Sequence, residues 1–238
     1  MILSIIIPVY NERPYVERLI RSVVACRVPP HIEKEIIAVN DGSDDGTEGI
    51  LERLAAELPV RVLHHSCNQG KGAALRTGLA RASGHFYLFQ DADLEYEPRD
   101  YALLLAPLID GSADVVYGSR FLHAHNAGIP FLSRTANRIL SSLSNWVTGL
   151  RITDMESGYK VFRREALQGV SIEEDGFGVE PELTAKVAKR IRSGTLRMTE
   201  VAVQYTPRQT SEGKKIRWYD AVWAVFCIVR YGFSHRER

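Results

Sequence analysis

The sequence contains few cysteines, and its charges nearly balance. Cys26, Cys67 and Cys227 lie far apart in a chain of 238 residues. This odd number and wide spacing exclude a disulfide framework or a zinc knuckle, and predict free, buried thiols in a reducing cytosol. A formal net charge of +1 gives no overall field that would attract nucleic acid, so we expect no nucleic-acid partner.

Targeting segments and linkers are also absent from the sequence pattern. Met1 leads directly into an apolar run at residues 2–7, which lacks the basic region and cleavage site of a signal peptide and is too short to span a bilayer. No Pro-, Gly- or Ser-rich linker and no repeat divides the chain. We therefore predict a single domain over residues 1–238, located in the cytoplasm.

Strand and helix patterns alternate along the first half of the chain. Apolar strand patterns cover residues 2–9, 35–39, 60–63, 86–89 and 114–117, and helical patterns cover 15–25, 47–58, 72–82 and 98–109. This alternation is typical of an α/β fold with a Rossmann-like, mostly parallel sheet and helices on both faces. After Tyr117 the spacing changes to helices at 134–147 and 180–191 and short strands at 159–162 and 199–205.

Two carboxylates one residue apart follow the predicted strand at 86–89. Asp91 and Asp93 point the same way if the backbone is extended. Like charges this close repel one another unless a cation lies between them. Hard oxygen ligands suit Mg²⁺ or Mn²⁺, which bind carboxylates together with substrate phosphates. The pair therefore indicates a metal-bridged diphosphate.

Three further polar groups follow predicted strands or precede a helix. Asp41 lies in a glycine-containing turn, where it could accept hydrogen bonds from a base or ribose or could belong to a helix cap. Gly70 and Lys71 precede a helix, as in phosphate-binding loops, although a simple turn explains the glycines nearly as well. Arg120 could pair with a phosphate or could be an ordinary exposed arginine.

The order of these motifs resembles family 2 glycosyltransferases with the A-type glycosyltransferase fold. Within that family the chain is most similar to dolichyl-phosphate (polyprenyl-phosphate) sugar synthases. One departure is Asn40, which stands where many relatives have aspartate. The matching stretches are residues 7–12, 39–47, 68–74, 90–94, 118–121, 153–160, 177–182 and 212–216.

The resemblance implies a nucleotide-sugar-binding half at about residues 1–122, an acceptor half at 123–206, and a basic loop with an apolar helix at 207–238. It implies that Asp91, Asp93 and Glu95 bind Mg²⁺ or Mn²⁺. The implied nucleotide-binding residues are Pro8, Tyr10, Glu12, Asp41, Gly70, Lys71, Gln90 and Asp91. The implied acceptor-phosphate residues are Arg134, Arg208, Lys214 and Lys215, and the implied catalytic residues are Asp93, Arg120, Asp154 and Glu180.

The implied reaction is an inverting transfer of a hexose from a UDP- or GDP-sugar to a polyprenyl or dolichyl phosphate. A phosphate monoester is already anionic near neutral pH, since its second pKa is about 6, and needs no strong general base. A hydroxyl acceptor on a glycolipid or glycan would need a carboxylate base. Candidates for that base are Asp154, Glu156, Glu180 and Glu182. An inactive nucleotide-sugar-binding protein is the non-enzyme alternative.

The end of the chain combines basic and apolar residues. Arg208, Lys214, Lys215 and Arg217 precede the apolar run at residues 221–229, which is too short to span a bilayer. Cationic clusters beside an apolar helix suit anionic lipid headgroups. The helix could instead pack on the core or in a homodimer interface. Many relatives continue into transmembrane helices, and the resemblance allows a separate membrane subunit as a partner, because family members without such helices work with one.

Overall fold

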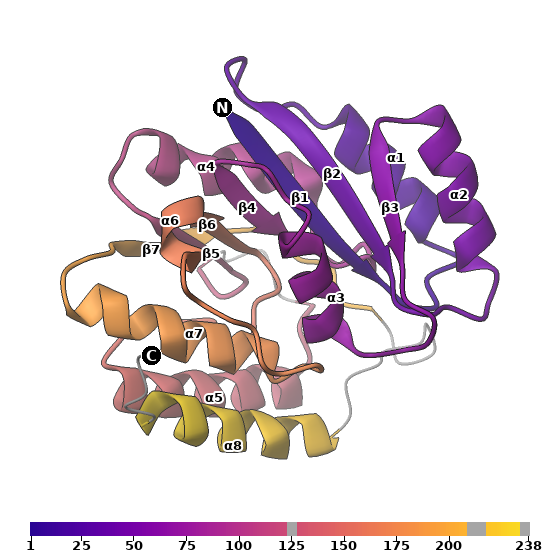
Figure 1. Cartoon of the computed structure of the whole chain (residues 1–238). Helices are drawn as coiled ribbons and strands as arrows, with labels where there is room; N and C mark the ends of the chain where they lie inside the picture. Colours follow the sequence, from indigo (N-terminus) through magenta and orange to yellow (C-terminus); the bar gives the residue numbers. More distant parts are fainter. Residues whose placement is uncertain (123–127, 209–217, 234–238) are drawn as a thin grey trace.

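The computed structural model describes residues 1–122, 128–208 and 218–233. Within these residues, seven strands form one sheet in the order β3-β2-β1-β4-β6-β5-β7 (Figure 1). The strands are β1 Ile2–Val9, β2 Glu33–Asn40, β3 Val60–His64, β4 Phe86–Phe89, β5 Val115–Ser119, β6 Lys160–Arg163 and β7 Met198–Ala202. The helices are α1 Val16–Ala25, α2 Thr47–Glu57, α3 Lys71–Leu79, η1 Pro98–Asp100, α4 Tyr101–Ile109, α5 Phe131–Thr148, α6 Arg164–Leu167, α7 Val179–Arg192 and α8 Trp218–Phe233.

The predicted α/β fold with a mostly parallel sheet is confirmed. β1 pairs in parallel with β2 and β4, β2 with β3, and β5 with β7. β6 runs antiparallel between β4 and β5. The sequence pattern predicts a strand at this place but not its position in the sheet. β6 can lie there because Val161 and Phe162 bury opposite faces in the two apolar layers.

Each face of the sheet carries its own apolar core. Leu3, Ile5 and Ile7 of β1 point to the face covered by α1, α2 and α4, whereas Ile6 points to the face covered by α3, α5, α7 and α8. This alternation follows from the two-residue repeat of a strand, and explains why β1 is apolar throughout. Figure 1 shows α5, α7 and α8 stacked together, with α8 outermost.

Two expectations about the chain's apolar residues need adjustment. All three cysteines are free, but Cys67 is exposed because it lies in the connection between β3 and α3. The inner face of α8 does pack on the body, through Cys227 and its neighbours, while the outer face is exposed. No helix in the described part of the chain has the length and apolar character needed to cross a bilayer.

Two helical glycines predict opposite effects of the same substitution. A Cβ atom on Gly78 of α3 would overlap the Cγ2 methyl of Ile6, whereas one on Gly49 of α2 would meet nothing within 4 Å. We expect Gly78→Ala to lower the free energy of unfolding by about 1–3 kcal/mol through overpacking. Gly49→Ala should raise it by about 0.5–1 kcal/mol, because alanine favours helix. Urea unfolding checks both, and equal stabilisation by the two changes would contradict this packing of α3 on β1.

Candidate active site

The predicted polar motifs gather at one edge of the sheet. Residues 10–12 follow β1, Asp41 follows β2 and Gln90 follows β4. Because these strands are parallel neighbours, their carboxyl ends meet at the same edge, where ligands bind in such folds. Pro8 and Tyr10 lie at this edge and are partly exposed.

Lys71 links two acidic residues at this edge. Its Nζ lies 2.6 Å from Oδ1 of Asp91 and 2.7 Å from Oε1 of Glu180. Burial opposes the charge of Lys71, but the two carboxylates outweigh burial and raise its pKa. The second oxygen of Glu180, Oε2, is buried and has no hydrogen-bond partner within the described residues. Three predicted site residues from α3, α7 and the loop after β4 are thus brought together.

Asp93 and Glu95 occupy the turn that follows. Burial first, and then the neighbouring carboxylates of Asp91 and Glu95, raise the pKa of Asp93 to about 8. Leu94 between them has a φ of 61°, a left-handed conformation that costs energy for leucine and is often found at functional sites. Glu95 accepts hydrogen bonds from the Tyr205 hydroxyl and the Arg208 backbone, both at 2.8 Å.

The donor chemistry of this turn fits a hard divalent cation. Asp91, Asp93 and Glu95 offer only carboxylate oxygens, and a cation would relieve the repulsion that raises the pKa of Asp93. Among the described residues, no group of three acidic, histidine or cysteine side chains is arranged to hold a metal ion. Asp91 is instead paired with Lys71. The three carboxylates therefore have the ligand chemistry that a divalent ion requires, but in this arrangement they bind protein groups.

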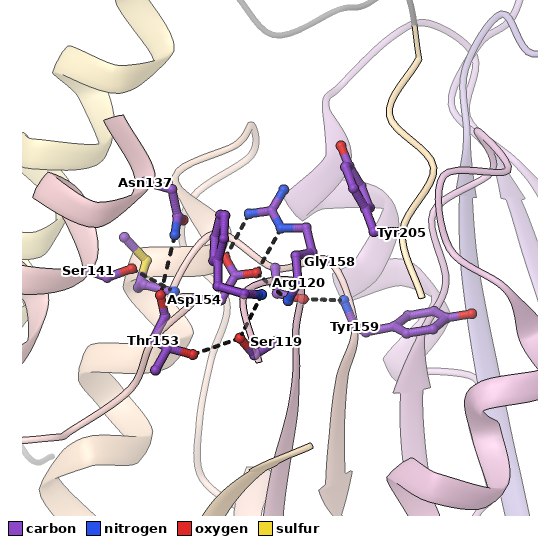
Figure 2. Close-up of polar contacts among 12 residues, drawn as sticks. Ser119, Arg120, Asn137, Ser141, Thr153, Asp154, Gly158, Tyr159 and Tyr205 are labelled. Atoms are coloured by element: carbon purple, nitrogen blue, oxygen red, sulfur yellow. Dashed lines mark hydrogen bonds and ion pairs between the residues drawn. The ribbon is translucent and has the colours of Figure 1, made fainter. Parts of the chain in front are cut away.

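Arg120 and Asp154 form a partly buried bidentate pair (Figure 2). Nε and Nη2 of Arg120 each donate to a different oxygen of Asp154 at 2.7 Å, and the backbone N–H adds a third bond at 3.0 Å. Asp154 is 0% exposed. The guanidinium also lies 5.2 Å from the ring centre of Tyr205, within reach of a cation–π contact. Asp154 therefore fixes the plane of the arginine at the end of β5.

Arg208 reaches back across the site to the loop after β1. Its guanidinium pairs with Glu12, with Nη2 2.5 Å from Oε2, and stacks on Tyr15 with 4.2 Å to the ring centre. Nε donates to the carbonyl of Asp93 at 2.8 Å. An arginine predicted to bind the acceptor thus pairs here with a residue predicted to bind the nucleotide. Lys214 and Lys215 lie outside the described residues.

Asp41 and Gln90 are buried and bound to protein groups. Asp41 accepts N–H bonds from Gln69 and Gly70 at 2.9 and 2.7 Å, and its Oδ1 lies 2.7 Å from Nδ1 of His65. Gln90 accepts hydroxyl bonds from two tyrosines at 2.7 Å and donates to the carbonyl of Asp91. These bonds hold the adjacent loops in position.

A hollow of about 380 Å³ lies beside the Arg120–Asp154 pair. Arg134 and Arg138 of α5 line it, together with Phe121 and Thr153, which are the chain neighbours of Arg120 and Asp154. The hollow thus joins a predicted acceptor residue, Arg134, to the pair at the end of β5. Arg138 carries no motif that would have identified it from the sequence.

Other site residues were missed by the sequence patterns. Tyr15 and Tyr205 stack on arginines, but in the sequence they appear only as a helix-start residue and a half-exposed strand residue. Lys160 is 1% exposed, and its ammonium donates to the carbonyls of Met155 and Ser157. Burial lowers the pKa of Lys160 to about 8. No local pattern distinguishes such a lysine from a solvated one.

Comparisons with known proteins agree with this geometry. Residues 4–170 match the model of the glycosyl transferase family 2, which is more than half of the chain. The chain is a family 2 glycosyltransferase. It is 30% identical to the polyprenol monophosphomannose synthase of Mycolicibacterium smegmatis over 98% of this chain and 87% of that protein. It is 31% identical to the undecaprenyl-phosphate mannosyltransferase of Micrococcus luteus, over 97% and 94%.

Other relatives are longer than the part that matches, and the chain spans about half of the length of two of them, 54% and 53%. Among solved structures, the glucosyl-3-phosphoglycerate synthase of Mycobacterium tuberculosis, in complex with Mn²⁺, UDP-glucose and phosphoglyceric acid, aligns with a TM-score of 0.70 at 22% identity. The alignment covers 97% of this glycosyltransferase and 79% of that chain. This likeness confirms the A-type glycosyltransferase fold.

Glu156 predicts a pH-dependent contribution to the stability of the transferase. Burial first, and then Glu180, raise its pKa from 4.5 to about 7. Its contribution to stability is therefore complete below pH 4.5 and is lost as the pH rises through 7. Relative to the wild type, Glu156→Gln should gain about 1–3 kcal/mol of unfolding free energy between pH 5 and pH 8. Urea unfolding at both pH values measures this difference, and a pH-independent difference would contradict the raised pKa.

Proposed function

We propose that this glycosyltransferase moves a hexose, with inversion, from a UDP- or GDP-sugar to a polyprenyl phosphate. The family membership supports a sugar transfer. The names of two relatives that match nearly the whole chain support mannose and a polyprenyl or undecaprenyl phosphate as the chemical classes involved. The choice between a phosphate and a hydroxyl acceptor follows from the carboxylates of the site.

The observation that carries the proposal is that three of the four candidate bases, Asp154, Glu180 and Glu182, are already bound. Burial raises the pKa of the fourth, Glu156, to about 7, so that it is largely protonated below pH 7. Both oxygens of Asp154 accept bonds from Arg120. Glu182 is 0% exposed, and its oxygens accept the backbone N–H groups of residues 173 and 174. Glu180 pairs with Lys71. A hydroxyl acceptor needs a free carboxylate, whereas a phosphate monoester brings its own negative charge.

The donor would bind at the edge formed by β1, β4 and the start of α3. We assign Pro8, Tyr10 and Glu12 to the nucleoside and Lys71 to the diphosphate. Asp91, Asp93 and Glu95 would hold the divalent ion, which supplies positive charge to the departing nucleoside diphosphate. The Mn²⁺ and UDP-glucose in the structural relative support this assignment. Arg120, held in orientation by Asp154, adds a fixed positive charge beside it.

The acceptor phosphate would enter through the hollow lined by Arg134 and Arg138. Guanidinium groups bind phosphate oxygens in a bidentate geometry. The lining residues Phe121 and Thr153 place this hollow next to Arg120. The acceptor oxygen would thus be positioned and partly neutralised by arginines, while the leaving diphosphate lies on the other side of Arg120. Arg208, Lys214 and Lys215 remain proposed acceptor residues.

α5 and α8 carry an exposed apolar face that suits a lipid surface. We call it the outer face. It comprises Phe131, Leu132, Ile139 and Trp146 of α5 and Tyr219, Val222, Trp223, Val225, Phe226, Val229 and Phe233 of α8. Trp146 and Phe233 meet with ring centres 6.3 Å apart, so the two helices form one continuous surface. Aromatic residues flanked by arginines are typical of helices at a membrane interface. We propose peripheral docking on the cytoplasmic side of the membrane.

Product analysis tests the reaction. The purified protein, Mn²⁺ or Mg²⁺ and radiolabelled UDP- and GDP-sugars are incubated with undecaprenyl or dolichyl phosphate. We expect acid-labile label in the organic phase, and a loss of at least 100-fold in Asp93→Asn, because the cation loses a ligand. Asp110→Asn, at the exposed end of α4, is the control. Transfer only to a hydroxyl-bearing glycolipid or glycan would overturn the acceptor assignment.

Vesicle co-sedimentation tests the outer face. Phe226 is 48% exposed on α8, and Leu103, on α4 at the opposite face of the sheet, is 54% exposed. We expect Phe226→Asp to weaken binding to anionic phospholipid vesicles about tenfold or more, and Leu103→Asp to leave it unchanged. Light scattering adds the alternative: a stable dimer that Phe226→Asp dissociates would assign the face to a second copy of the chain.

A further inference from the structure

Glu174 is a buried carboxylate that no step of the reaction uses. It lies in the connection between α6 and α7 and is 7% exposed. Two side chains of α8 donate to it: Trp223 Nε1 to Oε2 at 2.8 Å and the Tyr231 hydroxyl to Oε1 at 2.7 Å. Arg230 of the same helix lies 3.5 Å away. Two side chains of α8, the exposed Trp223 and the buried Tyr231, therefore direct their polar atoms to a single acceptor.

The backbone of the connection between α6 and α7 packs against the turn that carries Lys71. The carbonyl of Asp175 accepts the N–H of Ala73 at 3.1 Å. A Cβ atom on Gly70 would overlap the carbonyl of Asp175, and one on Gly72 would overlap the carbonyl of Glu174. The turn at residues 70–72 thus lies directly against this backbone, and a shift of the connection must move the turn.

This turn presents the ammonium of Lys71 to the metal-binding loop. Lys71, between the two close-packed glycines, pairs with Asp91 and Glu180. From the other side, Glu182 accepts the backbone N–H groups of Glu173 and Glu174 at 2.7 and 2.9 Å. A continuous series of contacts therefore runs from α8 through Glu174 to Lys71.

We propose that Glu174 is a positioning residue that couples α8 to the turn at residues 70–72, so that docking of α8 on a lipid surface and binding of a nucleoside diphosphate strengthen each other. This inference rests on the proposed function for the nature of the two ligands. The element with two states is α8, either docked on α5 and α7 or locally detached.

Detachment of α8 removes both neutral donors from Glu174. Because these side chains of α8 also cover Glu174, detachment exposes its carboxylate to water, and the connection is no longer held against the turn that carries Lys71. A lipid surface opposes detachment, because it contacts α5 and α8 together only when Trp146 and Phe233 are side by side. Lipid binding thereby lowers the entropy cost of ordering the nucleotide site.

The test measures the affinity for UDP and GDP, with Mn²⁺, by calorimetry in the absence and presence of vesicles of anionic phospholipid without polyprenyl phosphate. For the wild type we expect vesicles to strengthen nucleotide binding about fivefold or more, and nucleotide to strengthen vesicle binding by the same factor. Glu174→Gln and Tyr231→Phe should reduce this factor to about one. A variant that failed to fold would lose nucleotide binding itself. Loss of the mutual strengthening with nucleotide binding retained therefore reports on the coupling.

Asp175→Asn is the matched control. It removes the same charge one residue away, but from an exposed side chain that pairs with Arg76 of α3, so the coupling factor should stay at the wild-type value. If Glu174→Gln does not fold, the coupling factor of Tyr231→Phe tests the proposal, since this milder change removes only one hydroxyl and its hydrogen bond. A wild-type factor of one, or a factor retained in Tyr231→Phe, overturns the proposal. Vesicle-dependent nucleotide binding, together with no labelled lipid in the separate product analysis with undecaprenyl and dolichyl phosphate, would overturn the acceptor assignment and support the coupling.

Discussion

The arrangement of the site depends on one partly buried cation, the ammonium of Lys71 between Asp91 and Glu180. These residues come from three separate elements: the start of α3, the loop after β4 and the first turn of α7. Without a cation between them, the two carboxylates would repel each other in a poorly solvated place. Lys71 therefore allows two negative groups of the unliganded protein to lie close together, as a divalent ion does for the phosphates of a diphosphate.

The other charges of the site are also paired in advance. Arg120 is bound by Asp154 and Arg208 by Glu12. Such pairs gain little net stability, because desolvation offsets much of the attraction, but they fix where each charged group lies. A ligand that brings phosphates and a metal ion exchanges one set of ion pairs for another. The conformational entropy of these charged side chains is then already lost on folding and not on ligand binding. Such preorganisation is the basis of electrostatic catalysis.

Local patterns predicted the strands and the helices, because both depend on periodicity within a few residues. They did not predict that β6 lies between β4 and β5, since strand order is decided by long-range packing. Asp91 and Arg120, which follow predicted strands in the sequence, do lie beyond the carboxyl ends of β4 and β5. Their partners could not be predicted, because Tyr205 and Arg208 are distant in sequence and reach the site only through the final fold.

Asp41 has a structural role that its motif did not reveal. Its carboxylate holds the backbone of Gln69 and Gly70, directly before Lys71. The turn at residues 70–72 is thus held from one side by Asp41 and from the other by the connection that contains Glu174.

The composition of α8 follows from its two faces. A helix that only covered the core would be apolar on its inner side, yet the buried Tyr231 places an O–H there, and Trp223, which belongs to the outer face, adds an N–H to the same carboxylate. An apolar residue in place of Glu174 would remove the desolvation cost of a buried carboxylate, and such replacements are often neutral or stabilising. An apolar residue would not form the two directional hydrogen bonds, which fix the rotation of α8 about its axis and its position along that axis. That rotation decides which residues form the outer face, so the carboxylate that supports the Lys71 turn also sets the orientation of the surface proposed to meet the lipid.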